Sequence, residues 1–139
     1  MANNVHELRP KVGDSEKITI NLGYVDLGQI DLMVQDGFYS NRTDFIRTAI
    51  RTQLATRGEA LDQTAARRTL TLGSCHYTRR DLEEIRGTGQ MIHIRVLGLA
   101  SIADDVSPQL ALATIASVEV LGAFRAPAAV KAVLAPRTA

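Results

Sequence analysis

The sequence predicts an α+β fold in two parts, a strand with two helices over residues 17–66 and a small α/β domain over residues 67–139. Three observations predict it. Residues 17–22 strictly alternate polar and apolar side chains, as a half-buried strand does. Two segments with apolar residues at helical spacing follow. Beyond residue 66, alternating segments and helix-like segments take turns, which is typical of an α/β arrangement.

Composition excludes several classes of protein. The chain has 139 residues, of which 45% are hydrophobic and 22% charged, so it is neither collagen-like nor wholly disordered. One cysteine excludes an internal disulfide framework. Because no apolar run reaches the length of a membrane span and residues 1–17 contain no apolar signal segment, we expect a cytoplasmic protein that does not contact the membrane.

The N-terminal part begins with a polar segment, residues 1–16, that we interpret as a flexible arm. In the strand that follows, the alternation places Ile18, Ile20 and Leu22 on one side. It places the polar side chains on the other side, and these are Lys17, Thr19 and Asn21.

Two capped helices are predicted next. Asp26 is the expected N-cap of the first helix, with Gln29 completing a capping box, and Gly37 ends it. Asn41 is the expected N-cap of the second helix, with Asp44 as its partner. This helix runs past Ala55 and could continue into residues 58–66, with Gly58 as a weak point.

In the C-terminal part, the sequence predicts strands at residues 69–73 and 92–98. A short helix is predicted between them over residues 79–86, with Thr78 and Asp81 as its cap. Residues 94–98 are echoed 24 positions later by residues 118–122, and a loop and a proline-started helix follow each copy. This is a weak strand–loop–helix repeat, of the kind that stacks strand beside strand.

The N-terminal part is too small to bury a core alone, and a single strand leaves both of its edges unpaired. Pairing with the strand of a second chain answers both problems and predicts an intertwined dimer. The polar side of this two-stranded ribbon then faces outward, and such a ribbon fits the major groove of DNA. Lys, Asn and Thr are residue types that bind base edges there, which makes Lys17, Thr19 and Asn21 candidate base contacts.

The net charge of +1 argues against a general affinity for nucleic acid, so any DNA contact must be concentrated on a small surface. The start of the second helix offers free backbone N–H groups and the positive end of a helix dipole, which can hold a phosphate. The candidate phosphate contacts there are Ser40, Asn41, Arg42 and Thr43.

On these segments, residues 17–57 resemble the ribbon-helix-helix family of bacterial regulators, the Arc, MetJ and CopG type. KITINL, VDLGQIDLMVQDG and GFYSNRTDFIRTAIRTQL carry the resemblance, which covers under a third of the chain. The resemblance implies an intertwined dimer, base reading by Lys17, Thr19 and Asn21, and phosphate contact at Asn41, Arg42 and Thr43. The C-terminal part does not resemble an effector domain of that family.

Other charged and reactive residues have simpler explanations. Arg47 and Arg51 fit solvated helix faces, although either could contact a phosphate, and Arg67 and Arg68 fit a solvated pair at a domain junction. Cys75 and His76, together with His93 and His6, raise the hypothesis of a metal site, but too few ligands converge for zinc or nickel. Because neither a catalytic triad nor a phosphate-binding loop occurs, we expect no enzyme activity and no cofactor.

Three functions remain open. The first is a sequence-specific DNA-binding transcriptional regulator whose C-terminal domain (residues 67–139) assembles dimers into tetramers or larger homo-oligomers on double-stranded DNA at the nucleoid. The second is an antitoxin of a toxin–antitoxin pair, which would carry a disordered toxin-wrapping tail. The third is a structural scaffold whose C-terminal repeat polymerises.

Overall fold

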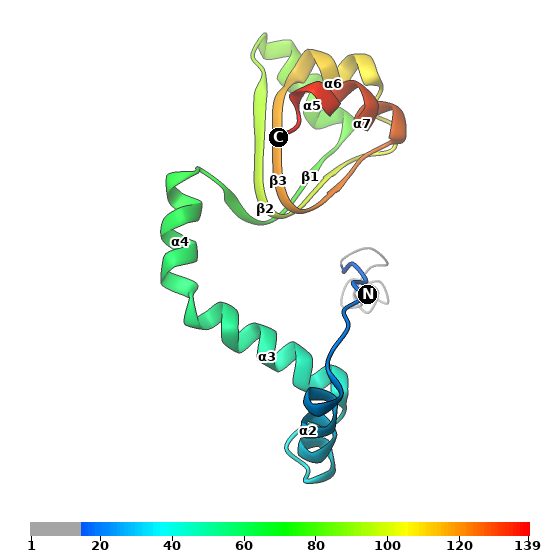
Figure 1. Cartoon of the computed structure of the whole chain (residues 1–139). Coiled ribbons are helices and arrows are strands. Elements are labelled where there is room, and N and C mark those ends of the chain that lie inside the picture. Colours follow the sequence, from blue (N-terminus) through cyan, green and yellow to red (C-terminus); the bar gives the residue numbers. More distant parts are fainter. Residues whose placement is uncertain (1–14) are drawn as a thin grey trace, which may run out of the picture. The chain divides into compact units, whose positions relative to one another are not determined.

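The computed structural model describes residues 15–139 and divides them into two units, residues 15–64 and residues 65–139 (Figure 1). Most of the expected arm over residues 1–16 lies outside the described residues, which include only Ser15 and Glu16 of it. The structure combines helices with one three-stranded sheet, as an α+β fold does.

Residues 16–23 lead into α2 (Tyr24–Gln35) without forming a helix or a ladder with any other described residue. The predicted start of α2 is wrong, because Gly23 and not Asp26 occupies the N-cap position. The Gly23 carbonyl accepts the N–H of Leu27 at 3.0 Å, so the helix begins a turn earlier than the capping-box pattern predicts. Asp26 instead lies in the first turn, where a carboxylate stabilises the positive end of the helix dipole.

The turn between α2 and α3 (Arg42–Thr56) follows the sequence signals. Gly37 has a φ of 82°, and its N–H and that of Phe38 donate to the carbonyls of Val34 and Met33. This is the Schellman arrangement that a glycine after a helix favours. The Asn41 side chain caps α3 by accepting the N–H of Asp44 at 2.8 Å, and the Asp44 carboxylate accepts the N–H of Ser40 at 3.0 Å.

The helix breaks at Arg57, and α4 (Gly58–Arg67) begins at the glycine that the sequence marks as a weak point. The division between the two units falls within α4. Thr69 follows α4 with a φ of 58°, an uncommon conformation for a β-branched residue. The N–H groups of Thr69 and Leu70 satisfy the last carbonyls of α4 in the same Schellman pattern.

In residues 65–139, each of three parallel strands is followed by a helix, and the strand order is β1-β2-β3. The helices lie together over one side of the sheet (Figure 1). The elements in chain order are β1 (Thr71–Tyr77), α5 (Arg79–Thr88), β2 (Ile92–Ile102), α6 (Pro108–Thr114), β3 (Ile115–Arg125), α7 (Ala128–Leu134) and the short 3-10 helix η1 (Ala135–Arg137).

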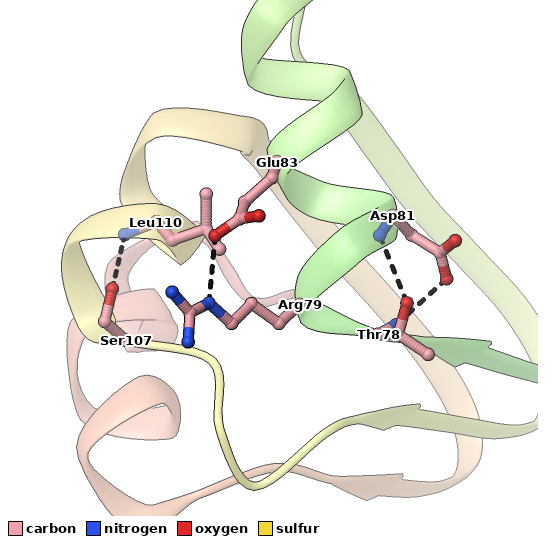
Figure 2. A network of polar contacts seen from close by, with 6 residues as sticks. All are labelled: Thr78, Arg79, Asp81, Glu83, Ser107 and Leu110. Carbon is pink, nitrogen blue, oxygen red and sulfur yellow. Dashed lines mark hydrogen bonds and ion pairs between the residues drawn. The ribbon is translucent and has the colours of Figure 1, made fainter.

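Side-chain caps begin two of these helices (Figure 2). Thr78 and Asp81 form the predicted capping box of α5, in which each side chain binds the other residue's backbone N–H. Ser107 caps α6 by accepting the N–H of Leu110 at 3.1 Å, and Pro108 occupies the first position of that helix. Sequence signals therefore locate these two helix starts to the residue.

The two similar segments of the sequence lie side by side. Ile94 pairs with Val118, and the pairing continues in register to Gly98 with Gly122. β1 supplies a third member of this row that was not predicted, since Gly73 pairs with Gly98 and Leu72 with Leu97. Only the Leu-Gly dipeptide is common to all three strands, which is too short to detect in the sequence alone.

This row of glycines explains why the strands are longer than predicted. Gly73, Gly98 and Gly122 have φ angles of 121°, 142° and 122°, which side-chain-bearing residues rarely adopt. A Cβ on Gly98 would lie 2.1 Å from the Gly73 carbonyl oxygen, and one on Gly122 would lie 2.1 Å from that of Gly98. The strands bend together in Figure 1. Glycine therefore continues each strand through a bend, whereas the alternation alone predicts that each strand ends at its glycine.

The core of this unit lies between the sheet and its helices. Alternate residues of β2 are buried on both sides of Gly98, as period-two alternation requires. The buried cluster comprises Leu82, Ile94, Val96, Ala100, Ile102, Val106, Leu110, Ala111, Ile115, Val118, Val130 and Leu134. In residues 15–64, by contrast, Ile30 is the one fully buried hydrophobic residue, so this unit has almost no core within a single chain.

Candidate nucleic-acid interface

The predicted base-contacting residues Lys17, Thr19 and Asn21 are all exposed in the extended segment before α2. Their apolar neighbours are exposed as well, with Ile18 at 72% and Ile20 at 57%. Ile20 and Leu22 line a groove from which the polar residues of the segment are absent. The alternation of the sequence therefore separates the polar side chains from the side chains that line the groove.

The groove has a volume of about 510 Å³ and lies between this segment and the two helices. Its walls are mostly apolar, and α2 and α3 supply most of them: Ile30, Met33, Phe45, Ile46, Ala49 and Ile50. Tyr39 packs edge-on against Phe45 behind the start of α3, with ring centroids 4.9 Å apart. An apolar groove of this size within so small a unit is a candidate surface for binding another apolar element.

The start of α3 presents the four predicted phosphate-contacting residues, Ser40, Asn41, Arg42 and Thr43, and all of them are exposed. The side-chain carbonyl oxygen of Asn41 accepts the N–H of Asp44, which leaves the N–H groups of Arg42 and Thr43 without a partner inside the helix. Asp44 adds a negative charge at this end, and its carboxylate engages the backbone of Ser40. The anion-binding capacity of this terminus therefore rests on two backbone donors and on Arg42.

The Arg42 side chain forms an ion pair that the sequence does not predict. Its Nε and one Nη donate to the two carboxylate oxygens of Asp31 in α2, each at 2.8 Å. The hydrogen bond from Arg42 lowers the pKa of Asp31 below its usual value, and the Asp31 carboxylate raises the pKa of Arg42. This two-pronged contact fixes the guanidinium in one orientation beside the helix terminus.

The other arginines differ in their surroundings. Arg47 and Arg51 are exposed on α3, in agreement with solvated helix faces. Arg68 is exposed near the division between the units, as a solvated residue at a domain junction would be, and it also forms an ion pair with Glu119 of β3. Its carbonyl accepts from Arg95 at 3.4 Å. β1 follows Arg68 closely in the chain, and these contacts hold the segment that leads into it.

Of the residues of the metal hypothesis, Cys75 and His93 line the same hollow, whereas His76 is not among the residues that line it. Cys75 is half-buried against the core, while the Nδ1 atoms of His76 and His93 lie 2.6 and 2.7 Å from the hydroxyls of Ser101 and Ser117. His6 lies outside the described residues. Across residues 15–139, no group of three or more His, Cys, Asp or Glu side chains is placed to hold a metal ion. No helix in that same range is long and apolar enough to cross a membrane.

Comparison with known proteins gives one match. The model of the Ribbon-Helix-Helix transcriptional regulator family matches residues 13–131. No curated protein and no solved structure matches the chain. The family match extends well past the N-terminal segment that carries the sequence resemblance, and takes in β1 to α7 in large part. Because this match covers most of the chain, the chain belongs to the ribbon-helix-helix family of transcriptional regulators.

Proposed function

We propose that this regulator binds a specific DNA sequence as a dimer, reading the major groove with residues 17–22 of both chains paired as an antiparallel ribbon. The observation that carries the proposal is the groove that Ile20 and Leu22 share with α2 and α3. A second copy of the same segment and helices would fill it with apolar side chains, and would give each strand the ladder partner it lacks in one chain.

On this proposal, Lys17, Thr19 and Asn21 of each chain contact base edges, because they stand opposite the apolar side of the segment. Ser40, Asn41, Arg42 and Thr43 contact phosphates and set the register of the ribbon on the duplex. A few side chains and two helix ends per dimer suffice for this, which fits the net charge of +1. The protein would then act at the nucleoid in the cytoplasm.

The C-terminal unit would assemble such dimers into tetramers or larger complexes, so that neighbouring sites are bound together and avidity rises without new base contacts. Two features favour this over the other functions. An antitoxin of this motif would carry a disordered tail, whereas residues 71–137 form regular strands and helices. A scaffold that grows by stacking β1 on β3 needs both sheet edges open, and Ala139 binds part of the outer edge of β3, at Val118.

Selection of binding sites from random DNA duplexes tests the proposal, with the full-length chain compared with Thr19→Ala and Asn21→Ala. We expect a defined sequence for the wild type, and a loss of about 1–3 kcal/mol of discrimination for each lost base contact. Arg86→Ala in α5 is the matched control, because it changes an exposed residue of the other unit. An unchanged selected sequence in both test variants would refute reading by the ribbon.

A further inference from the structure

The two edges of the parallel sheet differ in whether another segment of the chain pairs with them. At the β3 edge, the Ala139 N–H donates to the Val118 carbonyl at 2.9 Å, and Thr138 forms a β-bridge with Val118. Arg137 anchors this segment by donating to the carbonyls of Leu112 and Ile115, at 2.8 Å each. The segment after α7 therefore occupies part of the outer edge of β3.

The β1 edge has no such cover among residues 15–139, since β1 is an outer strand that pairs with β2 alone. Five of its seven residues are exposed, and Leu72 is 75% exposed. Thr71–Tyr77 contains neither proline nor any Asp, Glu, Lys or Arg. Natural sheets use such residues to keep free edges from pairing, so this edge lacks the usual protection.

A hollow of about 440 Å³ lies beside β1. Its walls combine residues of the core or packed against it, Cys75, Tyr77 and Val96, with four exposed residues, Thr69, Thr71, His93 and Arg95. Stacked strand–helix units need a terminal cap, because the last unit otherwise leaves its core face uncovered. The β3 end has a cap from the segment after α7, and the β1 end has an open hollow.

We propose that the β1 edge pairs with the β1 edge of a second copy of this chain, antiparallel about a two-fold axis, so that one sheet runs through both C-terminal units. This inference rests on the proposed assembly of the regulator through its C-terminal unit and names the contact that carries it. Stacking β1 of one chain on β3 of the next is opposed at Val118, where Thr138 and Ala139 occupy the β3 edge. Pairing of like edges avoids this obstacle, and each such contact joins two C-terminal units alone.

The composition of β1 suits pairing with itself. Because the strand carries no acidic or basic residue other than His76, two copies meet without strong like-charge repulsion. With the two strands centred on Ser74, Leu72 of one chain lies opposite His76 of the other. The pairing would supply the outward N–H and C=O groups of each strand with partners, which is the main stabilisation at a sheet edge.

A matched pair of substitutions separates edge pairing from docking on the face of the sheet. Leu72, Leu97 and Leu121 form one row across the three strands, and Leu121 is 42% exposed on β3. In sedimentation of the full-length chain, we expect Leu72→Lys to lower the weight-average mass toward half, and Leu121→Lys to leave it unchanged. An equal effect of both variants, or no effect of either, would overturn the proposal.

Cysteine cross-linking gives a second readout that does not depend on Leu72→Lys folding. In a Cys75→Ser background, a single cysteine is placed at residue 72, 74 or 76, and at residue 121 as the control. Cα atoms of facing residues in an antiparallel pair lie about 4.5–5.5 Å apart, within disulfide range. We expect a disulfide-linked dimer from residue 74, which faces its own copy in this register, and none from residue 121. A dimer linked through residue 72 or residue 76 instead would show that the same edges pair in a shifted register. No cross-link at any β1 position, with sequence-specific DNA binding intact, would reject the edge contact and leave the DNA-binding proposal standing.

Discussion

Arg42, at the start of α3, forms an ion pair with Asp31. In our proposal its side chain also contacts a DNA phosphate. Asp31 accepts from Nε and one Nη, which leaves the N–H groups of the other Nη for the phosphate. Arg42→Ala should therefore weaken binding to all duplexes alike, and should flatten the slope of log K against log salt by about one. Fluorescence anisotropy titrations over a salt series measure that slope.

The control for this measurement is Arg79→Ala, which removes an exposed arginine that is ion-paired with Glu83 at 2.9 Å in the other unit. It should leave both the affinity and the salt slope unchanged. A loss confined to one DNA sequence in Arg42→Ala would contradict the phosphate role and would indicate a base contact instead.

We expect Asp81 to make the stability of the C-terminal unit depend on pH. The backbone N–H of Thr78 donates to the Asp81 carboxylate, and this bond, together with the hydrogen bond to the Thr78 side chain, lowers the pKa of Asp81 from its ordinary value of 3.8. A lowered pKa gives stabilisation that is complete above the unfolded-state pKa and is lost as the pH falls through the folded-state pKa. Asp81→Asn should therefore reduce the acid-side loss of stability, measured by urea unfolding between neutral pH and about pH 3.

Thr78→Val is the informative comparison for that experiment. It removes the hydroxyl that caps the N–H of Asp81, but it keeps the backbone N–H that binds the carboxylate. The variant should be less stable by about 1 kcal/mol at neutral pH, because the N-cap is lost. The variant should also lose part of the acid dependence, because the hydroxyl contributes to the lowered pKa of Asp81. An unchanged acid dependence would show that the backbone bond alone lowers that pKa.

Among the helices and strands, the sequence predicts those features that depend on contacts between residues close together in the chain. The caps at Asn41, Thr78 and Ser107 were predictable, because each hydrogen bond joins residues three positions apart. The pair of Arg42 and Asp31 was not, since these residues lie eleven positions apart and the turn between α2 and α3 decides whether they meet. The alternation predicts that Lys17, Thr19 and Asn21 are exposed, but within one chain it does not distinguish them from Ile18 and Ile20, which are exposed as well.

The glycines of the sheet were misinterpreted for a physical reason. A glycine in an alternating segment marks either a strand end or a place where backbones approach closely, and a single sequence does not distinguish them. At Gly98 the close approach applies, because the Gly73 carbonyl occupies the space where a Cβ would stand. The strands were therefore predicted too short, although their pairing register follows the repeat in residues 94–98 and 118–122.

Gly98→Ala tests this explanation of the glycine row. The conformation at φ 142° and the 2.1 Å contact with the Gly73 oxygen act together. We expect about 1–3 kcal/mol of backbone strain and a comparable steric cost, which would unfold the C-terminal unit or lower its melting temperature sharply. Gly87→Ala is the control, because Gly87 lies inside α5 and a Cβ there would have no other atom within 4 Å. Alanine at that position should stabilise the helix by about 0.5–1 kcal/mol.

For the whole molecule, the two units differ in how much apolar surface one chain buries. Residues 15–64 bury only Ile30 among their hydrophobic side chains, whereas residues 65–139 hold a large buried cluster. On our proposal, a second copy supplies the N-terminal unit with the apolar surface that it lacks within one chain, and the C-terminal unit connects the dimers.

Ile20→Asp tests whether the N-terminal unit dimerises independently of the contacts made by the C-terminal unit. Ile20 is 57% exposed in one chain and lines the groove that the partner would fill, so a carboxylate there would be buried without a partner in the dimer. We expect the ribbon dimer to dissociate and sequence-specific DNA binding to disappear, while the circular dichroism of the C-terminal unit and cross-linking through β1 persist. Analytical ultracentrifugation and gel shifts on a selected duplex measure the outcome, and Ile20→Val, which keeps the side chain apolar, should retain both properties. An Ile20→Asp protein that still bound its DNA as a dimer would show that the ribbon is not the dimer contact. The groove could not hold a partner strand in that variant, because the carboxylate at residue 20 would be buried without a partner.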